Sequence, residues 1–119
     1  MLRTAVFAAL LAALVLSAGA LATATPVGPL PKGPVTTVSA ARGTLVSVAL
    51  PHRSGGKVWR QANTVDQMVL KQVSEGDVGP SVVIVFKAVG KGTAKVAYGL
   101  TKGETKKAYA SQTFTVTVR

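Results

Sequence analysis

Hydrophobic side chains recur at every second position over short segments of this chain, and glycine- or proline-containing breaks separate the segments. Val or Leu occupies alternate positions in 45–50, Val, Ile, Phe or Ala does so in 82–88, and Thr alternates with Phe or Val in 113–118. A period of two places apolar side chains on one face of a β-strand, whereas an amphipathic helix needs a period near 3.6. The pattern therefore predicts an all-β fold.

Seven strands are predicted, each bounded by turn-forming residues. Their ranges are 36–41, 44–50, 58–62, 68–74, 81–88, 93–100 and 108–119. The breaks between them include 51–56, 76–80 and 101–107, and the segment between the third and fourth strands is predicted to be a loop. Seven short strands within about 85 residues are typical of an immunoglobulin-like antiparallel β-sandwich. The 119 residues are expected to form one such domain.

The N-terminal segment has the pattern of a secretory signal peptide. Arg3 precedes an apolar run over 5–16, and small residues follow up to Ala24. The run is shorter than the roughly 20 residues that span a bilayer, and small residues at alternate positions suit signal peptidase. We expect 1–22 to be the signal peptide, with cleavage after Ala22 or Ala24. The protein is then secreted or periplasmic, with no transmembrane segment after cleavage.

The segment that follows, 23–35, is rich in proline and glycine. Four of the six prolines and two glycines fall within 25–34. Proline fixes φ and lacks an amide hydrogen, so the segment is expected to be an extended leader outside any sheet interior. The predicted domain then occupies 36–119.

The residue inventory restricts the chemistry of the chain. It has no Cys and one His, which excludes disulfides, thiolate metal sites and multi-histidine metal sites. His52 has Ser54 nearby in sequence and Ser111 farther along, but no nucleophile-elbow motif accompanies them. Glu75 and Asp77 fall short of the six to eight oxygen ligands typical of calcium sites. We expect neither an enzyme nor a cofactor or metal.

Positive charge dominates the remaining side chains. The chain carries 14 Lys and Arg against 4 Asp and Glu, and loss of residues 1–22 removes only Arg3, which leaves a net charge of +9. In a sandwich of this type the breaks at 51–56 and 101–107 lie at one end. The basic side chains in or beside them, expected to form a cationic rim with His52, are Arg53, Lys57, Arg60, Lys102, Lys106 and Lys107.

Two aromatic residues are expected in the core. Trp59 stands near the start of the third strand, where a large side chain fills the space between two sheets. Tyr98 follows Ala94 and Val96 on one strand face, and its hydroxyl is expected to reach a backbone group.

Several framework segments resemble a known family. They are Leu50-Pro51, Gly56 with Trp59 three residues later, Phe86-Lys87-Ala88 followed by Gly92 and Tyr98, and Phe114-Thr115-Val116. In these residues the chain resembles the chagasin-like inhibitors of cysteine proteases over about 36–119. The resemblance implies an immunoglobulin-like sandwich that blocks papain-type proteases with three adjacent loops.

The resemblance also implies which residues contact the protease. The first loop corresponds to His52, Arg53, Ser54, Gly55, Gly56 and Lys57, the second to a segment that keeps Gly76 and Gly79, and the third to Leu100, Thr101 and Lys102. The family's first loop reads Asn-Pro-Thr-Thr-Gly-Tyr, of which this chain keeps the glycine at Gly56. The family's third loop reads Arg-Pro-Trp, and no aromatic residue stands at the corresponding positions here.

Two functions follow as hypotheses. The first is a secreted or periplasmic inhibitor of papain-type cysteine proteases that inserts three loops into the protease cleft. The alternative is a non-inhibitory periplasmic immunoglobulin-like domain whose cationic rim binds an anionic envelope component or an acidic protein. A nucleic-acid partner is not expected, because the basic loops lack interleaved aromatic residues for base stacking. We expect the protein to be a monomer.

Overall fold

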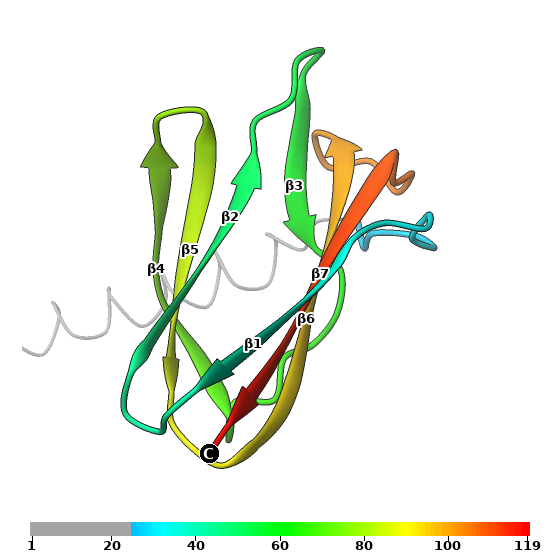
Figure 1. The fold of residues 1–119 in the computed structure, drawn as a ribbon. Helices are drawn as coiled ribbons and strands as arrows, with labels where there is room; N and C mark the ends of the chain where they lie inside the picture. Colours follow the sequence, from blue (N-terminus) through cyan, green and yellow to red (C-terminus); the bar gives the residue numbers. More distant parts are fainter. Residues whose placement is uncertain (1–24) are drawn as a thin grey trace, which may run out of the picture.

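The computed structural model describes residues 25–119, which form seven β-strands in two sheets (Figure 1). The strands are β1 (Val35–Ala40), β2 (Leu45–Pro51), β3 (Lys57–Gln61), β4 (Leu70–Val78), β5 (Ser81–Ala88), β6 (Gly92–Lys102) and β7 (Ala110–Val118). Within this part of the chain, no helix has the length and apolarity needed to cross a membrane. The predicted signal peptide lies outside the described residues.

The two sheets have the strand orders β1-β7-β6-β3 and β2-β5-β4. All pairs are antiparallel except β1 and β7, which run in the same direction with Val35 opposite Thr113. The predicted seven-stranded sandwich is confirmed, with one parallel pair at its edge. Both β1 and β7 run toward the end of the sandwich where the C-terminus lies (Figure 1). After β1 the chain turns at Arg42–Gly43 and enters β2 of the other sheet.

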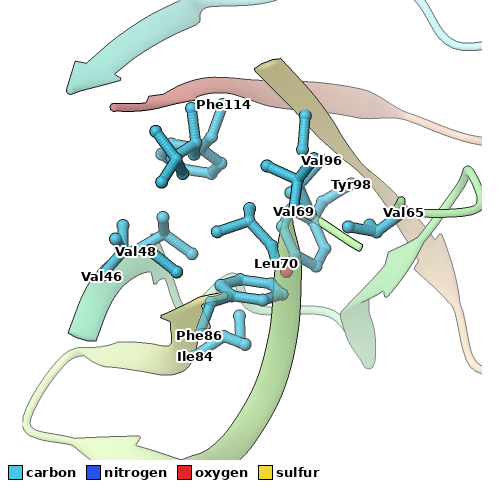
Figure 2. Packing of buried hydrophobic residues seen from close by; sticks show 14 of the residues in the cluster. Val46, Val48, Val65, Val69, Leu70, Ile84, Phe86, Val96, Tyr98 and Phe114 are labelled. Carbon is cyan, nitrogen blue, oxygen red and sulfur yellow. The ribbon is translucent and has the colours of Figure 1, made fainter. Parts of the chain in front are cut away.

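The core lies between the two sheets and is built from the alternating residues. Figure 2 shows Val46 and Val48 of β2 and Phe86 of β5 facing Val96 of β6 and Phe114 of β7. All five are buried, while the intervening residues of β2 are exposed. The sequence period of two thus corresponds to the inner faces of the sheets.

The segment between β3 and β4 is a loop, as expected, and it closes one end of the core. Val65 and Val69 are buried there, although both lie outside the strands. The Asn63 side chain continues the edge of the sheet: it donates to Lys95 O at 2.8 Å and accepts from the Ala97 amide at 2.9 Å. An asparagine can replace a strand residue here because its amide group offers both a donor and an acceptor.

Trp59 joins the two sheets near the point where β2 ends and β3 begins. Its ring is partly buried against the core, and its indole Nε1–H donates to Pro51 O at 2.8 Å. Pro51 ends β2 in one sheet, whereas Trp59 lies on β3 in the other. The side chain predicted to fill the space between sheets therefore also bonds one sheet to the other.

Tyr98 lies in the core as predicted, but its hydroxyl differs from the expectation. The side chain is 4% exposed and meets Phe114 edge to face, with ring centroids 6.2 Å apart. Its hydroxyl has no hydrogen-bond partner, so the expected contact with a backbone group is absent. The side chain belongs to the cluster of buried hydrophobic residues, which offer it no hydrogen-bond partner. Burial raises the pKa of this hydroxyl above its ordinary value, and the Glu75 carboxylate acts in the same direction.

Replacing Tyr98 with phenylalanine is expected to preserve or raise stability, by up to about 1 kcal/mol, because it removes a buried hydroxyl without a partner. Since the folded-state pKa is raised, the unfolded tyrosine ionises first, and wild-type stability falls as the pH rises above about 10. Urea unfolding of both proteins at neutral and alkaline pH checks this. The Tyr98→Phe protein should lose less stability at high pH; an equal loss, or a less stable variant at neutral pH, would contradict the prediction.

Candidate functional site

Three connections between strands lie at one end of the sandwich, opposite the C-terminus (Figure 1). We call 52–56, between β2 and β3, the first loop, and Gly79-Pro80, between β4 and β5, the second loop. The third loop is 103–109, between β6 and β7. They lie at one end because β2, β4 and β6 run toward it and β3, β5 and β7 run away from it.

The tip of the first loop stands clear of the rest of the molecule. Ser54 is exposed, and a Cβ atom added at Gly55 or Gly56 would meet no atom within 4 Å beyond the adjoining residues. Both glycines have positive φ, 80° and 72°, which favours glycine over any other residue. The tip is therefore a narrow, exposed turn with little side-chain bulk.

His52 connects the first loop to the second. Its amide donates to Pro80 O at 2.9 Å, and its Nε2 lies 3.2 Å from Asp77 Oδ1. Both side chains of this pair are well exposed, so solvent competes with their contact and limits its strength. The backbone bond fixes the two loops beside each other.

The second loop is shorter than expected. The sequence predicted a break over 76–80, but β4 continues to Val78, and only Gly79 and Pro80 connect the strands. A register shift between Gln72 and Ser74 lets β4 stay paired with β5, and Gly79 has φ +58°, as the first position of a tight II′-type hairpin requires. Gly76 consequently lies in β4 opposite Val83.

The third loop begins later than expected. Leu100, Thr101 and Lys102 were expected to contact a protease, but all three belong to β6. Leu100 is 4% exposed and Thr101 is fully buried, so the protein itself covers both side chains. The difference arises because β3 pairs with this part of β6 and Arg60 binds the Thr101 hydroxyl, whereas the local sequence shows only a Thr-Lys-Gly break. Lys102 is exposed and remains available.

Arg60 was expected on the cationic rim, but it binds three segments of the protein itself. Its Nε donates to Thr101 Oγ1 at 3.1 Å, its Nη1 to Thr25 O at 2.6 Å and its Nη2 to Thr105 O at 2.5 Å. The guanidinium thus joins β6, the leader and the third loop. A planar group with five N–H donors can hold several acceptors in this way.

The proline-rich leader lies along the outer face of β6 and β7. Gly28 N–H donates to Lys106 O at 2.7 Å, and Ser111 Oγ donates to Pro31 O at 2.6 Å. A Cβ at Gly33 would lie 2.1 Å from Ser111 O. Only glycine, which has no Cβ, therefore allows the leader to approach β7 this closely. Residues 25–34 form no strand, and the contact of Gly28 with Lys106 also supports the third loop.

Tyr109 is a candidate functional residue that sequence reasoning missed. It is 41% exposed at the end of the third loop, with the ammonium groups of Lys57, Lys102 and Lys107 at 5.0, 5.5 and 5.0 Å from its ring centroid. The sequence signal was an aromatic residue two positions after the basic pair Lys106-Lys107. Its position in the last predicted strand made it resemble a framework residue.

No catalytic arrangement connects the residues considered from sequence. His52 pairs with Asp77, Ser54 is exposed at the first loop tip, and the Ser111 hydroxyl donates to the leader. Across residues 25–119 no group of three or more His, Asp or Glu side chains is placed to hold a metal ion. The described loop end offers backbone, small polar and cationic groups, which suit binding.

Comparison with known proteins identifies the fold. No family model and no curated protein matches the sequence. Among solved structures, the chain is similar to the cysteine protease inhibitor EhICP2 from Entamoeba histolytica, at 17% identity and a TM-score of 0.56, over 75% of this chain and 99% of that one. It is also similar to PbICP-C, solved in complex with falcipain-2, at 13% identity and a TM-score of 0.59, over 78% of this chain and 94% of that one.

These similarities confirm the chagasin-like framework that the sequence predicted. They concern the fold, because the sequence identities are low. The first neighbour is described as a cysteine protease inhibitor.

Proposed function

We propose that this protein is a secreted or periplasmic inhibitor of papain-type cysteine proteases, and that its three loops enter the cleft of the protease. The observation that carries the proposal is the gathering of three loops at one end of a sandwich that shares its fold with a cysteine protease inhibitor. The fold is also that of a protein solved in complex with falcipain-2.

The form of the first loop supports insertion into a narrow cleft. Ser54, Gly55 and Gly56 form an exposed tip with little side-chain volume, so backbone atoms can approach the floor of a cleft closely. Arg53 and Lys57 flank the tip. The second loop is fixed beside it by the bond from His52 N–H to Pro80 O, so two of the three loops are held in place before binding. Such preorganisation reduces the entropy lost on association.

Titration of residues 23–119 against a panel of papain-type proteases tests the proposal. These residues include all seven described strands and their core. Inhibition that can be overcome by raising the concentration of substrate is expected for at least one protease. Absence of inhibition of every panel member at micromolar concentration would overturn the proposal.

Replacing Ser54 with tryptophan is expected to weaken inhibition at least about 10-fold without loss of stability, because the new ring projects from an exposed tip into the space a cleft floor would occupy. The measurement is the inhibition constant, accompanied by thermal unfolding.

Ser39 supplies a matched control. It is exposed on β1, which runs toward the opposite end of the sandwich, so Ser39→Trp adds the same bulk away from the loops. Its inhibition constant should equal that of the wild type. Equal effects of the two substitutions, or none from Ser54→Trp, would contradict the placement of the first loop in the cleft.

A further inference from the structure

We propose that Lys57, Lys102 and Lys107, gathered around Tyr109, form a docking surface for carboxylate side chains at the rim of the target protease's cleft. We call these four residues the lysine cluster. The inference rests on the proposed function and extends it, because it specifies the chemistry of the partner: a papain-type protease whose cleft is bordered by acidic residues on the side that meets the third loop.

The lysine cluster is assembled by strand pairing from three parts of the chain. Lys57 begins β3 and lies directly opposite Lys102 at the end of β6, while Lys107 and Tyr109 come from the third loop. The Tyr109 amide donates to Leu100 O at 2.7 Å, which holds the ring beside this strand pair. All three ammonium groups lie within 5.5 Å of the ring centroid, the range in which the π-face attracts a cation.

The charge of this surface is not balanced within the described protein. Over residues 25–119 the one close contact between a basic and an acidic side chain joins His52 to Asp77, so the three lysines have no acidic partner among these residues. Like charges directly opposite on neighbouring strands repel each other, and a third positive charge adds to the repulsion. A carboxylate from outside would relieve this repulsion, and Tyr109 would offer it a hydroxyl donor and an apolar surface.

Position favours a protein partner over other anionic ligands. The lysine cluster lies at the loop-bearing end, beside the segments proposed to enter the protease, so binding of the loops brings the border of the cleft against it. Arg60 is not part of this surface, because its guanidinium is engaged with the protein itself. The remaining charges therefore form a local surface with an aromatic centre, suited to a few carboxylates at fixed positions.

The experiment compares the wild type with the triple variant Lys57→Gln, Lys102→Gln, Lys107→Gln. Association rate constants are measured with two papain-type proteases that the wild type inhibits, one with an acidic and one with a neutral cleft border. Each is measured at about 20 mM and about 300 mM NaCl. With the acidic protease the triple variant should associate at least about 10-fold more slowly at low salt, and salt should remove most of the difference. With the neutral protease the two proteins should associate at similar rates.

A matched control comes from the other end of the sandwich. Lys71 and Lys87 also lie directly opposite each other, on β4 and β5, and Lys91 follows in the next turn; all three are exposed. Their triple replacement with glutamine makes the same change in net charge away from the loops. It should leave most of the wild-type association rate with the acidic protease.

The outcomes separate the two proposals. Equal slowing by both triple variants would mean that overall charge suffices and would overturn the lysine cluster as a docking surface. Inhibition that is unaffected by either variant and by salt would overturn it as well, while the proposed inhibitor function stands. Absence of any protease inhibition by the wild type would overturn both. Thermal unfolding of the two triple variants confirms that each is folded.

Discussion

Replacing Arg60 with alanine is expected to lower the free energy of unfolding by about 2–3 kcal/mol and to weaken inhibition about 10-fold or more. Its guanidinium makes one hydrogen bond each to Thr101, Thr25 and Thr105. Hydrogen bonds that involve a charged group contribute about 1.5–3 kcal/mol each, and partial exposure here lets water replace some of that contribution. Urea unfolding measures the loss, and amide exchange over 25–31 and 103–109 should accelerate together.

Faster amide exchange in both segments at once is what distinguishes loss of Arg60 from a general loss of stability. The leader and the third loop are far apart in sequence but are both bound by Arg60, so release of one should release the other. Arg53→Ala removes the same charge from an exposed position in the first loop and should leave both exchange rates unchanged. Arg60→Lys should recover little stability, because an ammonium cannot reproduce the planar set of donors. Unchanged exchange in Arg60→Ala would show that the leader and third loop hold their places without it.

Replacing Trp59 with alanine is expected to cost about 3 kcal/mol, at the lower end of the range for large aromatic residues because the ring is only partly buried. The loss has two parts, the packing of the ring against the core and the bond from Nε1 to Pro51 O that joins the sheets. Without them the ends of β2 and β3 should separate, and the first loop between them should lose its fixed position. Chemical unfolding followed by far-ultraviolet circular dichroism measures the stability, and the inhibition constant reports the loop.

Trp59→Phe separates the two parts. It keeps most of the apolar ring but has no N–H donor, so Pro51 O loses its partner. We expect a cost of about 1 kcal/mol and a weaker effect on inhibition than in Trp59→Ala. If the two variants were equally destabilised, the hydrogen bond would account for the whole effect; if neither were destabilised, the proposed link between the sheets would be wrong.

Much of the fold was predictable because its causes are local. In β2 and β5 the side chains alternate between the core and the opposite face, so hydrophobicity along the sequence shows directly which residues are buried. Tyr98 was placed correctly in the core because it alternates with Ala94 and Val96, and Trp59, placed by its position in the sandwich, packs partly buried against that core. Bounds were less predictable where pairing overrides a local break: Gly76 looked like part of a turn, yet it lies in β4 because the bulge preserves the pairing with β5.

The candidate site was harder to predict because it depends on contacts between distant segments. The first loop could be located from its glycines, which adopt the positive φ that such residues favour. Thr101 could not be recognised as buried, since its hydroxyl contacts Arg60 and Val58 of β3, which are distant in sequence. Tyr109 could not be recognised as the centre of a charged cluster, since Lys57 and Lys102 reach it only through the pairing of β3 with β6.

The sequence alone determined an all-β sandwich of seven strands, the inner face of its main strands and an excess of positive charge, because each depends on composition or on a period of two residues. Tertiary structure decided which polar and charged residues serve the framework and which remain available. Arg60 is used to hold the leader and third loop, whereas Lys57, Lys102 and Lys107 are left around Tyr109. The physical reason is that the sequence gives the number of charged side chains, whereas the contacts of each one depend on strand pairing and on the path of the leader across β6 and β7.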